Sequence, residues 1–179
     1  LSLLKSDLDL FSESVYCFTP SGDVKNLPTG STPVDFAYSI HSAVGNKMVG
    51  ARVNGKLVNI NYQIQNGDRI EILTSQNSKG PSRDWLKYVK SISARHKIRQ
   101  YFKKEMKEEN IRVGKNMLEL ACKNQNMSLA EIVDTQEFAK LLARGSFVGV
   151  EELYASIGGG STNAMTVVNH FHQIKLRQQ

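Results

Sequence analysis

Apolar and polar residues alternate in short runs over the first part of the chain, and this period of two predicts β-strands. The run from Val15 to Thr19 predicts a first strand, and after the turn residues PSGD the run VKNLP is expected to return antiparallel to it. Apolar–polar alternation on both sides of Asn54-Gly55 predicts a β-hairpin with a type I′ turn. The last alternating run, RIEILT, follows a second turn at Asn66-Gly67.

Between these strands, the segment GSTPVDFAYSIH has the features of a helix start. Thr32 suits the N-cap, Pro33 suits the first helical position, and Asp35 places an acid in the first turn. The order is then strand, strand, helix, strand, strand and a final strand. A mixed sheet that carries one helix in this order predicts a β-grasp, or ubiquitin-like, arrangement.

After Thr74 and the polar loop SQNSKGPS, the period changes to that of a helix. The apolar residues with this spacing are Trp85, Tyr88, Val89 and Ile92, and then Ile98, Tyr101, Phe102 and Met106. Further helical patterns lie at RVGKNMLELACK, SLAEIVD, TQEFAKLLARG, VEELYASIG and STNAMTVVNHFHQI. The short loops between them predict a compact all-helical domain or a helical hairpin with a small cap. The predicted fold class is α+β, with a lead-in at 1–14, a β-grasp domain at 15–76 and a helical domain at 77–179.

The net charge of +6 is concentrated in one segment. Residues 79–107 contain ten Lys or Arg against two acids, and the flanking regions are nearly neutral. Such a segment is either an ordinary solvated helix face or a surface for a polyanion, and the scarcity of acids for i,i+4 pairing favours the polyanion. We therefore expect phosphate contacts, without base-specific reading, from Lys79, Arg83, Lys87, Lys90, Arg95, Lys97, Arg99, Lys103, Lys104 and Lys107.

Cysteine usage and hydropathy predict a cytoplasmic protein. Cys17 and Cys122 stand alone in apolar patterns, which indicates reduced, buried thiols. No apolar run approaches the ~20 residues of a membrane span. The chain begins inside an apolar pattern at Leu1 without a methionine, so we expect a piece of a longer protein.

Two motifs suggest ligand chemistry and are interpreted without a ligand. The segment GGGST, Gly158 to Thr162, has no following Lys and no preceding strand, so it predicts a helix end leading into an N-cap at Ser161 or Thr162. His170 and His172 would point about 200° apart on a helix and could not share one metal ion, so tail residues are the interpretation. We expect no catalytic residue, no metal site and no cofactor.

The stretch from VYCFTPSGD to DRIEILTS, followed by GPSRDWLKYV and ARHKIRQYFKKE, resembles the TGS domain and following helical domain of long RelA/SpoT-type proteins. Those proteins are bifunctional synthetases and hydrolases of the alarmone ppGpp. The resemblance is dense over Val15 to Glu109 and rests on order and pattern over 110–179. The chain has four histidines and no nucleotide-binding loop with lysine, so the catalytic regions are not expected here. The resemblance implies a regulatory module of the stringent response.

The stretch AYSIHSAVGNK predicts a short helix that ends near His41, followed by a glycine turn at Gly45. From the residues alone, His41 is either a helix-end residue bonded to a loop carbonyl or a contact for a ligand. The resemblance implies that this histidine contacts the unpaired 3′ CCA end of deacylated tRNA at the ribosome, and imidazole suits stacking and hydrogen bonding to RNA ends. Lys47, Arg52 and Arg69 are the other candidates for that contact.

A partner of a different class remains open. TGS modules of SpoT-like proteins are associated with acyl carrier protein, and they also pack against their own catalytic domains. Acyl carrier proteins are acidic, so the same basic segment would suit them. The sequence leaves tRNA and protein docking as alternatives, with no membrane partner expected.

Overall fold

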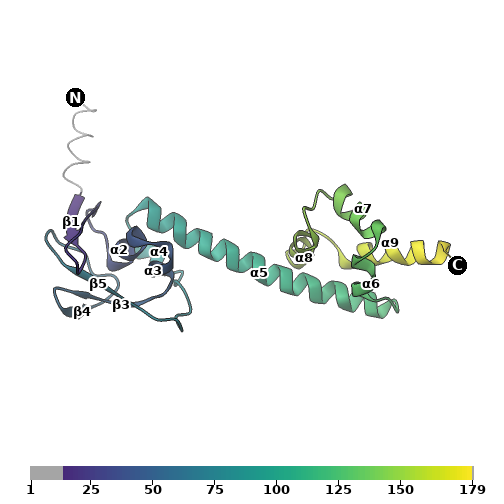
Figure 1. Ribbon diagram of the computed structural model, residues 1–179, viewed down its shortest axis with the longest axis horizontal. Helices are drawn as coiled ribbons and strands as arrows, with labels where there is room; N and C mark the ends of the chain where they lie inside the picture. The colour runs from purple at the N-terminus through teal and green to yellow at the C-terminus, as the bar shows by residue number, and fades with distance from the viewer. Residues whose placement is uncertain (1–13, 179) are drawn as a thin grey trace, which may run out of the picture. The chain divides into compact units, whose positions relative to one another are not determined.

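The computed structural model describes residues 14–178 (Figure 1). They divide into two compact units, one ending at Phe102 and one beginning at Lys103. The lead-in predicted for 1–14 lies, apart from Ser14, outside the described residues. The predicted α+β class is confirmed, because the strands all precede a long helical region.

The strands of the first unit are β1 (Ser14–Phe18), β2 (Val24–Pro28), β3 (Met48–Val53), β4 (Lys56–Val58) and β5 (Ile70–Thr74). β1 pairs antiparallel with β2, and β3 lies between β4 and β5, antiparallel to both. A parallel bridge from Phe18 to Arg69 connects the two groups of strands. Asn54 and Gly55 both have positive φ, 53° and 85°, as the predicted type I′ turn requires.

The helices of the first unit are α2 (Pro33–Ile40), α3 (Ser42–Asn46), α4 (Trp85–Tyr88) and the beginning of α5 (Ile92–Asn124). Thr32 is the N-cap of α2 and Pro33 its first residue, as predicted. The predicted glycine turn is instead the short helix α3, because the chain breaks helical geometry only at His41 and then resumes it. Gly45 belongs to this helix and faces Tyr38, where an added Cβ would lie 2.4 Å from the ring.

Helix α2 lies between two apolar clusters of the first unit. Phe36 faces the cluster of the sheet, with Val15, Cys17, Leu27, Val53, Ile64 and Ile70. Tyr38 belongs to the other cluster, with Val34, Ala37, Met48, Trp85, Val89, Ala94 and Ile98. The helical segment after residue 84 is therefore part of the core that supports α2.

Asp35 ties the start of α2 to the start of α5. Its carboxylate is fully buried and accepts from Thr32 N at 2.9 Å, from Lys90 N at 3.0 Å and from Ser91 N at 2.8 Å. A buried carboxylate is stable when several N–H groups satisfy its oxygens. One side chain thus satisfies backbone donors at the beginnings of two helices.

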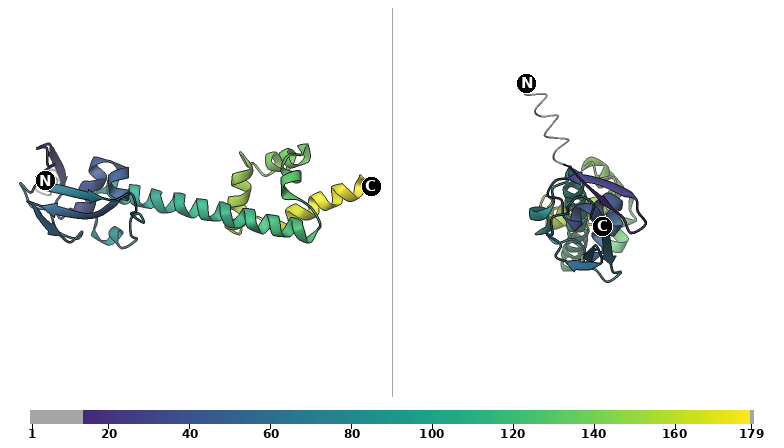
Figure 2. Two further views of the ribbon diagram at one scale, coloured as in Figure 1. Left: turned by 60° about the horizontal axis from the view of Figure 1, so that its bottom comes forward. Right: turned by 90° about the vertical axis from the view of Figure 1, so that its left-hand side faces the viewer.

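The second unit contains the rest of α5, then α6 (Leu129–Val133), α7 (Gln136–Arg144), α8 (Val150–Gly158) and α9 (Ala164–Arg177). The last four agree with the predicted patterns. The patterns around Ile98 and at RVGKNMLELACK are one unbroken helix, α5, rather than separate elements (Figures 1 and 2). Among the described residues, no helix is long and apolar enough to span a membrane.

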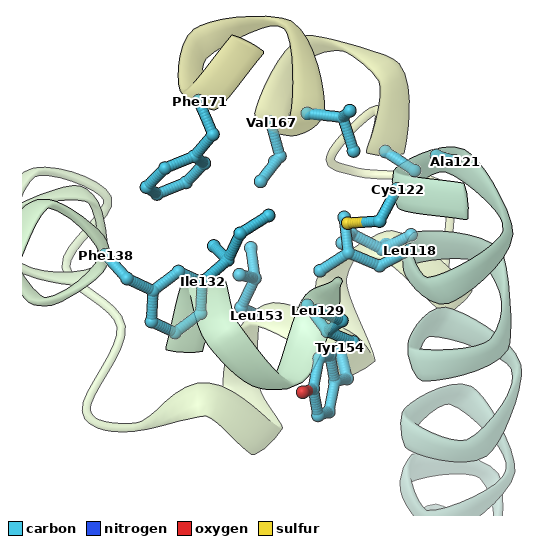
Figure 3. Close-up of a cluster of buried hydrophobic side chains, with 13 residues drawn as sticks. Leu118, Ala121, Cys122, Leu129, Ile132, Phe138, Leu153, Tyr154, Val167 and Phe171 are labelled. Carbon is cyan, nitrogen blue, oxygen red and sulfur yellow. The ribbon is translucent and has the colours of Figure 1, made fainter. Parts of the chain in front are cut away.

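Apolar side chains from all five helices form the core of the second unit (Figure 3). Phe138 of α7 and Phe171 of α9 have ring centroids 6.0 Å apart, and Leu153 of α8 is fully buried. The remaining buried members are Leu118, Ala121, Cys122, Leu129, Ile132, Tyr154, Ile157, Ala164, Val167 and Val168.

Two glycines allow α5 and α8 to cross at very short distance. A Cβ on Gly114 would lie 1.7 Å from the backbone oxygen of Tyr154, and one on Gly158 would lie 1.9 Å from that of Asn110. Gly158 is therefore a packing residue as well as part of a helix end. The N-cap predicted after it was wrong: Asn163 caps α9, accepting from Met165 N at 2.8 Å, because an asparagine side chain reaches these donors directly.

His170 and His172 lie within α9 on either side of the buried Phe171. The interpretation of them as tail residues was wrong, because α9 continues to Arg177 and its apolar side belongs to the core.

Candidate nucleic-acid interface

His41 lies at the junction of two helices. It ends α2 and is the N-cap of α3, where its Nδ1 accepts a hydrogen bond from Ala43 N at 3.0 Å. Because Nδ1 accepts, the neutral ring carries its proton on Nε2. The side chain is exposed, so the ring presents a flat face and one N–H donor to solvent.

Two lysines lie beside the two helices that meet at this histidine, Lys47 at the end of α3 and Lys97 against α2. Lys47 ends α3 and its Nζ lies 3.1 Å from Gln76 Oε1 in the loop after β5. Lys97, on α5, donates from Nζ to the carbonyl oxygen of Tyr38 at 2.9 Å, three residues before His41. The structure therefore brings a residue of the basic segment to the end of α2, across 59 positions of sequence. No sequence signal marks that contact.

Arg52 and Arg69 are not part of this group. Arg52 is the next-to-last residue of β3, on the exposed face of the sheet, with Nη1 3.8 Å from Glu71 Oε1. Arg69 lies beside Asn54, at the opposite end of β3 from Lys47, and its Nη1 donates to Pro20 O at 3.4 Å. A strand rises about 3.3 Å per residue, so Lys47 and Arg69 lie on the order of 20 Å apart. The four residues predicted around the RNA end do not form one pocket.

The first part of the basic segment is largely occupied by contacts within the first unit. Arg83 stacks over the ring of Phe102 at 4.4 Å, and Arg95 donates to Val89 O at 3.1 Å. Lys87 pairs with Asp84 at 3.4 Å. The aliphatic part of Lys90 lies against Gly30, and Lys79 is exposed in the loop before α4.

The remaining basic residues lie along one side of α5. His96, Arg99, Lys103 and Lys107 recur at intervals of three and four residues, so they share a helix face, and Lys104 lies beside them. We call these five residues the basic face. Glu105 follows Ile98 by seven residues and so lies on the other side of the helix. Glu105 is the one acid among residues 92–107, so the first half of this helix is strongly basic.

Neither thiol offers reactive chemistry. Burial raises the pKa of Cys17 to about 11 and also raises the pKa of Cys122, so both remain protonated near neutral pH. Among the residues that the structure describes, no group of three or more His, Cys, Asp or Glu could hold a metal ion.

Comparison with known proteins assigns both units to a class. Residues 15–74 match the TGS domain, and residues 101–172 match the RelA/SpoT AH domain. The chain is thus a TGS domain followed by an AH domain, neither of which is a catalytic domain. It belongs to the long RelA/SpoT-type proteins, as the resemblance predicted.

Three relatives illustrate the similarity to RelA/SpoT-type proteins. The GTP pyrophosphokinase of Streptomyces coelicolor is 43% identical over 166 residues, which is 92% of this chain and 20% of that protein. The bifunctional (p)ppGpp synthase/hydrolase RelA of Mycobacterium tuberculosis is 42% identical over 89% of this chain and 22% of its own length. The GTP pyrophosphokinase of Escherichia coli is 44% identical over 89% and 21%. The chain spans about one fifth of the length of the curated relatives it matches.

Proposed function

We propose that this chain is the regulatory region of a (p)ppGpp synthetase/hydrolase and that it binds the 3′ CCA end of deacylated tRNA at the ribosome. The observation that carries the proposal is the exposed imidazole of His41, whose Nδ1 accepts from Ala43 N at the start of α3. A flat ring with an N–H donor suits an unpaired RNA end, which is bound by stacking and base-edge hydrogen bonds, and Lys47 at the end of α3 and Lys97 beside Tyr38 of α2 supply cations for its phosphates.

The basic face extends this surface along α5. It would contact acceptor-stem or ribosomal RNA phosphates, which requires cations without competing acids. Lys97 belongs to the same helix and lies beside the end of α2. Arg69 is the weakest of the predicted contacts, because it lies at the far end of β3 from Lys47.

Deacylated and aminoacylated tRNA would be distinguished at the terminal ribose. A free hydroxyl would fit beside His41, whereas an esterified amino acid would clash or leave polar groups without partners. Occupancy would favour alarmone synthesis over hydrolysis in the whole protein, which requires that the bound RNA make different contacts in the two states. In this proposal the chain itself catalyses nothing, and its other partners are the catalytic domains of the whole protein.

The test is an NMR titration of the isotope-labelled chain with an acceptor-stem minihelix that ends in CCA, with and without an esterified amino acid. The informative variant is His41→Asn, because asparagine retains an N-cap oxygen for Ala43 N and removes the ring. We expect shifts around His41 in the wild-type chain that weaken on esterification and in the variant. Gln76→Ala, which removes only the partner of Lys47, is the control for disturbance of the neighbouring loop.

The same titration separates the alternative partner. Shifts confined to the basic face, indifferent to the ester and to His41→Asn, would reject the sensing of the tRNA end. Acyl carrier protein, which is acidic, would then be the next partner to titrate against the basic face.

A further inference from the structure

A groove of about 390 Å³ lies in the second unit, between α7, α8 and α9. Leu153 and Val167 form its buried floor, with Leu141 partly buried beside them, and Phe147 forms a wall. Figure 3 shows Leu153 and Val167 within the same apolar cluster. The side chains of Leu141 and Phe147 are partly exposed and give a ligand an apolar surface, and the volume of the groove is in the range of small-molecule sites.

Two nitrogen groups meet at the rim of this groove. Nη2 of Arg144, the last residue of α7, lies 3.4 Å from Nε2 of His170 on α9. The guanidinium can only donate, so Nε2 is the acceptor and the neutral imidazole carries its proton on Nδ1. Among the described residues, Arg144 has no carboxylate partner, and no acidic residue lines the groove.

A cation in the last turn of a helix is also favourable to the helix dipole, which explains an arginine at this position in general. It does not explain why the side chain reaches α9, nor how the groove's wall is held. Ser146 has a φ of 59°, a left-handed conformation that is unfavourable for a residue with a Cβ. Gly145 leaves room for the Phe147 ring, which a Cβ would meet at 2.4 Å. The hydrogen bonds of this helix end, from Phe147 N to Leu142 O at 2.9 Å and from Ser146 N to Ala143 O at 3.1 Å, compensate for that conformation and hold Phe147 against the groove.

We propose that this groove binds a small monocarboxylate with an apolar body, such as a branched aliphatic acid. The guanidinium fork of Arg144 matches a carboxylate in geometry, and its single permanent charge matches a monoanion. The apolar body would lie against Leu141, Phe147 and the small exposed part of Val167. An amino acid fits less well, because the groove offers no acidic residue for its ammonium group. This site lies wholly in the second unit and does not depend on the proposed binding of RNA.

The test uses the whole chain and compares 4-methylpentanoate with its neutral analogue 4-methylpentan-1-ol by NMR titration. We expect saturable shifts of the amides of Leu141, Gly145 and Thr166 with the acid, and binding of the alcohol weaker by roughly tenfold or more. Acetate, which has the charge without the body, should bind more weakly than the acid.

Arg144→Gln should weaken binding of the acid by about tenfold and leave the alcohol unchanged. Arg177→Gln is the matched control, since Arg177 is an exposed arginine in the last turn of α9 outside the groove. Equal binding of acid and alcohol by the wild-type chain, or shifts that never saturate or lie elsewhere, would overturn the proposal. The wild-type comparison decides the matter even where Arg144→Gln disturbs the fold.

Discussion

The two compact units are stabilised by different kinds of interaction. All four buried polar residues among those described, Ser31, Thr32, Asp35 and Asp68, lie in the first unit. The Asp68 carboxylate accepts hydrogen bonds from Asn54, Tyr62 and Gln65. The Asp35 carboxylate likewise accepts from backbone N–H groups at the starts of two helices. The described part of the second unit is built instead from apolar side chains and from a crossing of backbones at two glycines.

This difference has a physical consequence. Hydrogen bonds to a buried carboxylate are directional, so they fix the mutual orientation of the elements they connect. Apolar packing depends on shape and volume and is sensitive to any added atom. The first unit thereby holds the exposed groups around His41 in defined positions, and the second forms a core that a groove can open into. The following changes, in order of expected effect, would test this contrast.

Gly114→Val should have the largest effect. The position has no room for a Cβ, which would overlap the backbone oxygen of Tyr154, so α5 and α8 must separate. We expect a loss of about 3 kcal/mol or more from the second unit. Amide hydrogen exchange should show faster exchange in α8 and α9, with the strands of the first unit unchanged.

The control for Gly114→Val is Gly149→Ala, where an added Cβ meets nothing within 4 Å. It should leave the protection of α8 nearly unchanged. If both variants lost the same protection in α8, the crossing of α5 and α8 would not be the cause of the loss.

Asp35→Asn should destabilise the first unit by about 2 kcal/mol, since an amide replaces a charged acceptor and turns an N–H₂ towards buried donors. Lys90 and Ser91 should lose amide protection, and the orientation of α5 within this unit should become variable. Asp134→Asn, a change at an exposed acid at the end of α6, should have no such effect. If the Ser91 amide remained protected from exchange in Asp35→Asn, the carboxylate would not be what joins the start of α5 to α2.

Lys97→Met should have a smaller effect, about 1 kcal/mol, because it removes one hydrogen bond from a partly exposed ammonium to the Tyr38 carbonyl. If RNA binds as proposed, the affinity of the variant for the minihelix should fall as well. Lys104→Met is the matched control for the loss of stability. Lys104 is an exposed lysine seven residues further along α5, outside the hydrogen bond to Tyr38. A thermal melt and the minihelix titration measure the two effects separately.

Arg99→Glu should leave stability within about 0.5 kcal/mol, because Arg99 is exposed and has no ion pair among the described residues. The variant should weaken binding of the minihelix and lower the slope of log affinity against log salt by about 1. Lys123→Glu makes the same change of charge on the opposite side of α5. An equal loss of affinity with Lys123→Glu would mean that net charge alone governs binding.

The local elements were largely readable from the sequence. The cap at Thr32 and Pro33, the turn at Asn54-Gly55 and the patterns of α6 to α9 were all predicted, because each depends on neighbouring residues. The unbroken α5 was not, since its middle carries mixed charges and gives little apolar period. The residues predicted around the RNA end are only partly together: His41 and Lys47 lie at the two ends of α3, whereas Arg69 lies at the far end of β3. The contact of Lys97 with the Tyr38 carbonyl of α2 is long-range and could not be predicted.

The sequence by itself determined the order of the strands, most of the helices, the concentration of the net positive charge in 79–107 and the family. These follow from local periodicity, composition and motifs that need no knowledge of distant contacts. Only the tertiary structure decided that Asp35 joins two helix starts, that Gly45 makes room for Tyr38, and that Gly114 and Gly158 let α5 meet α8. Each of these depends on atoms brought together from distant positions, and the free energy of such contacts has no local signature in the sequence.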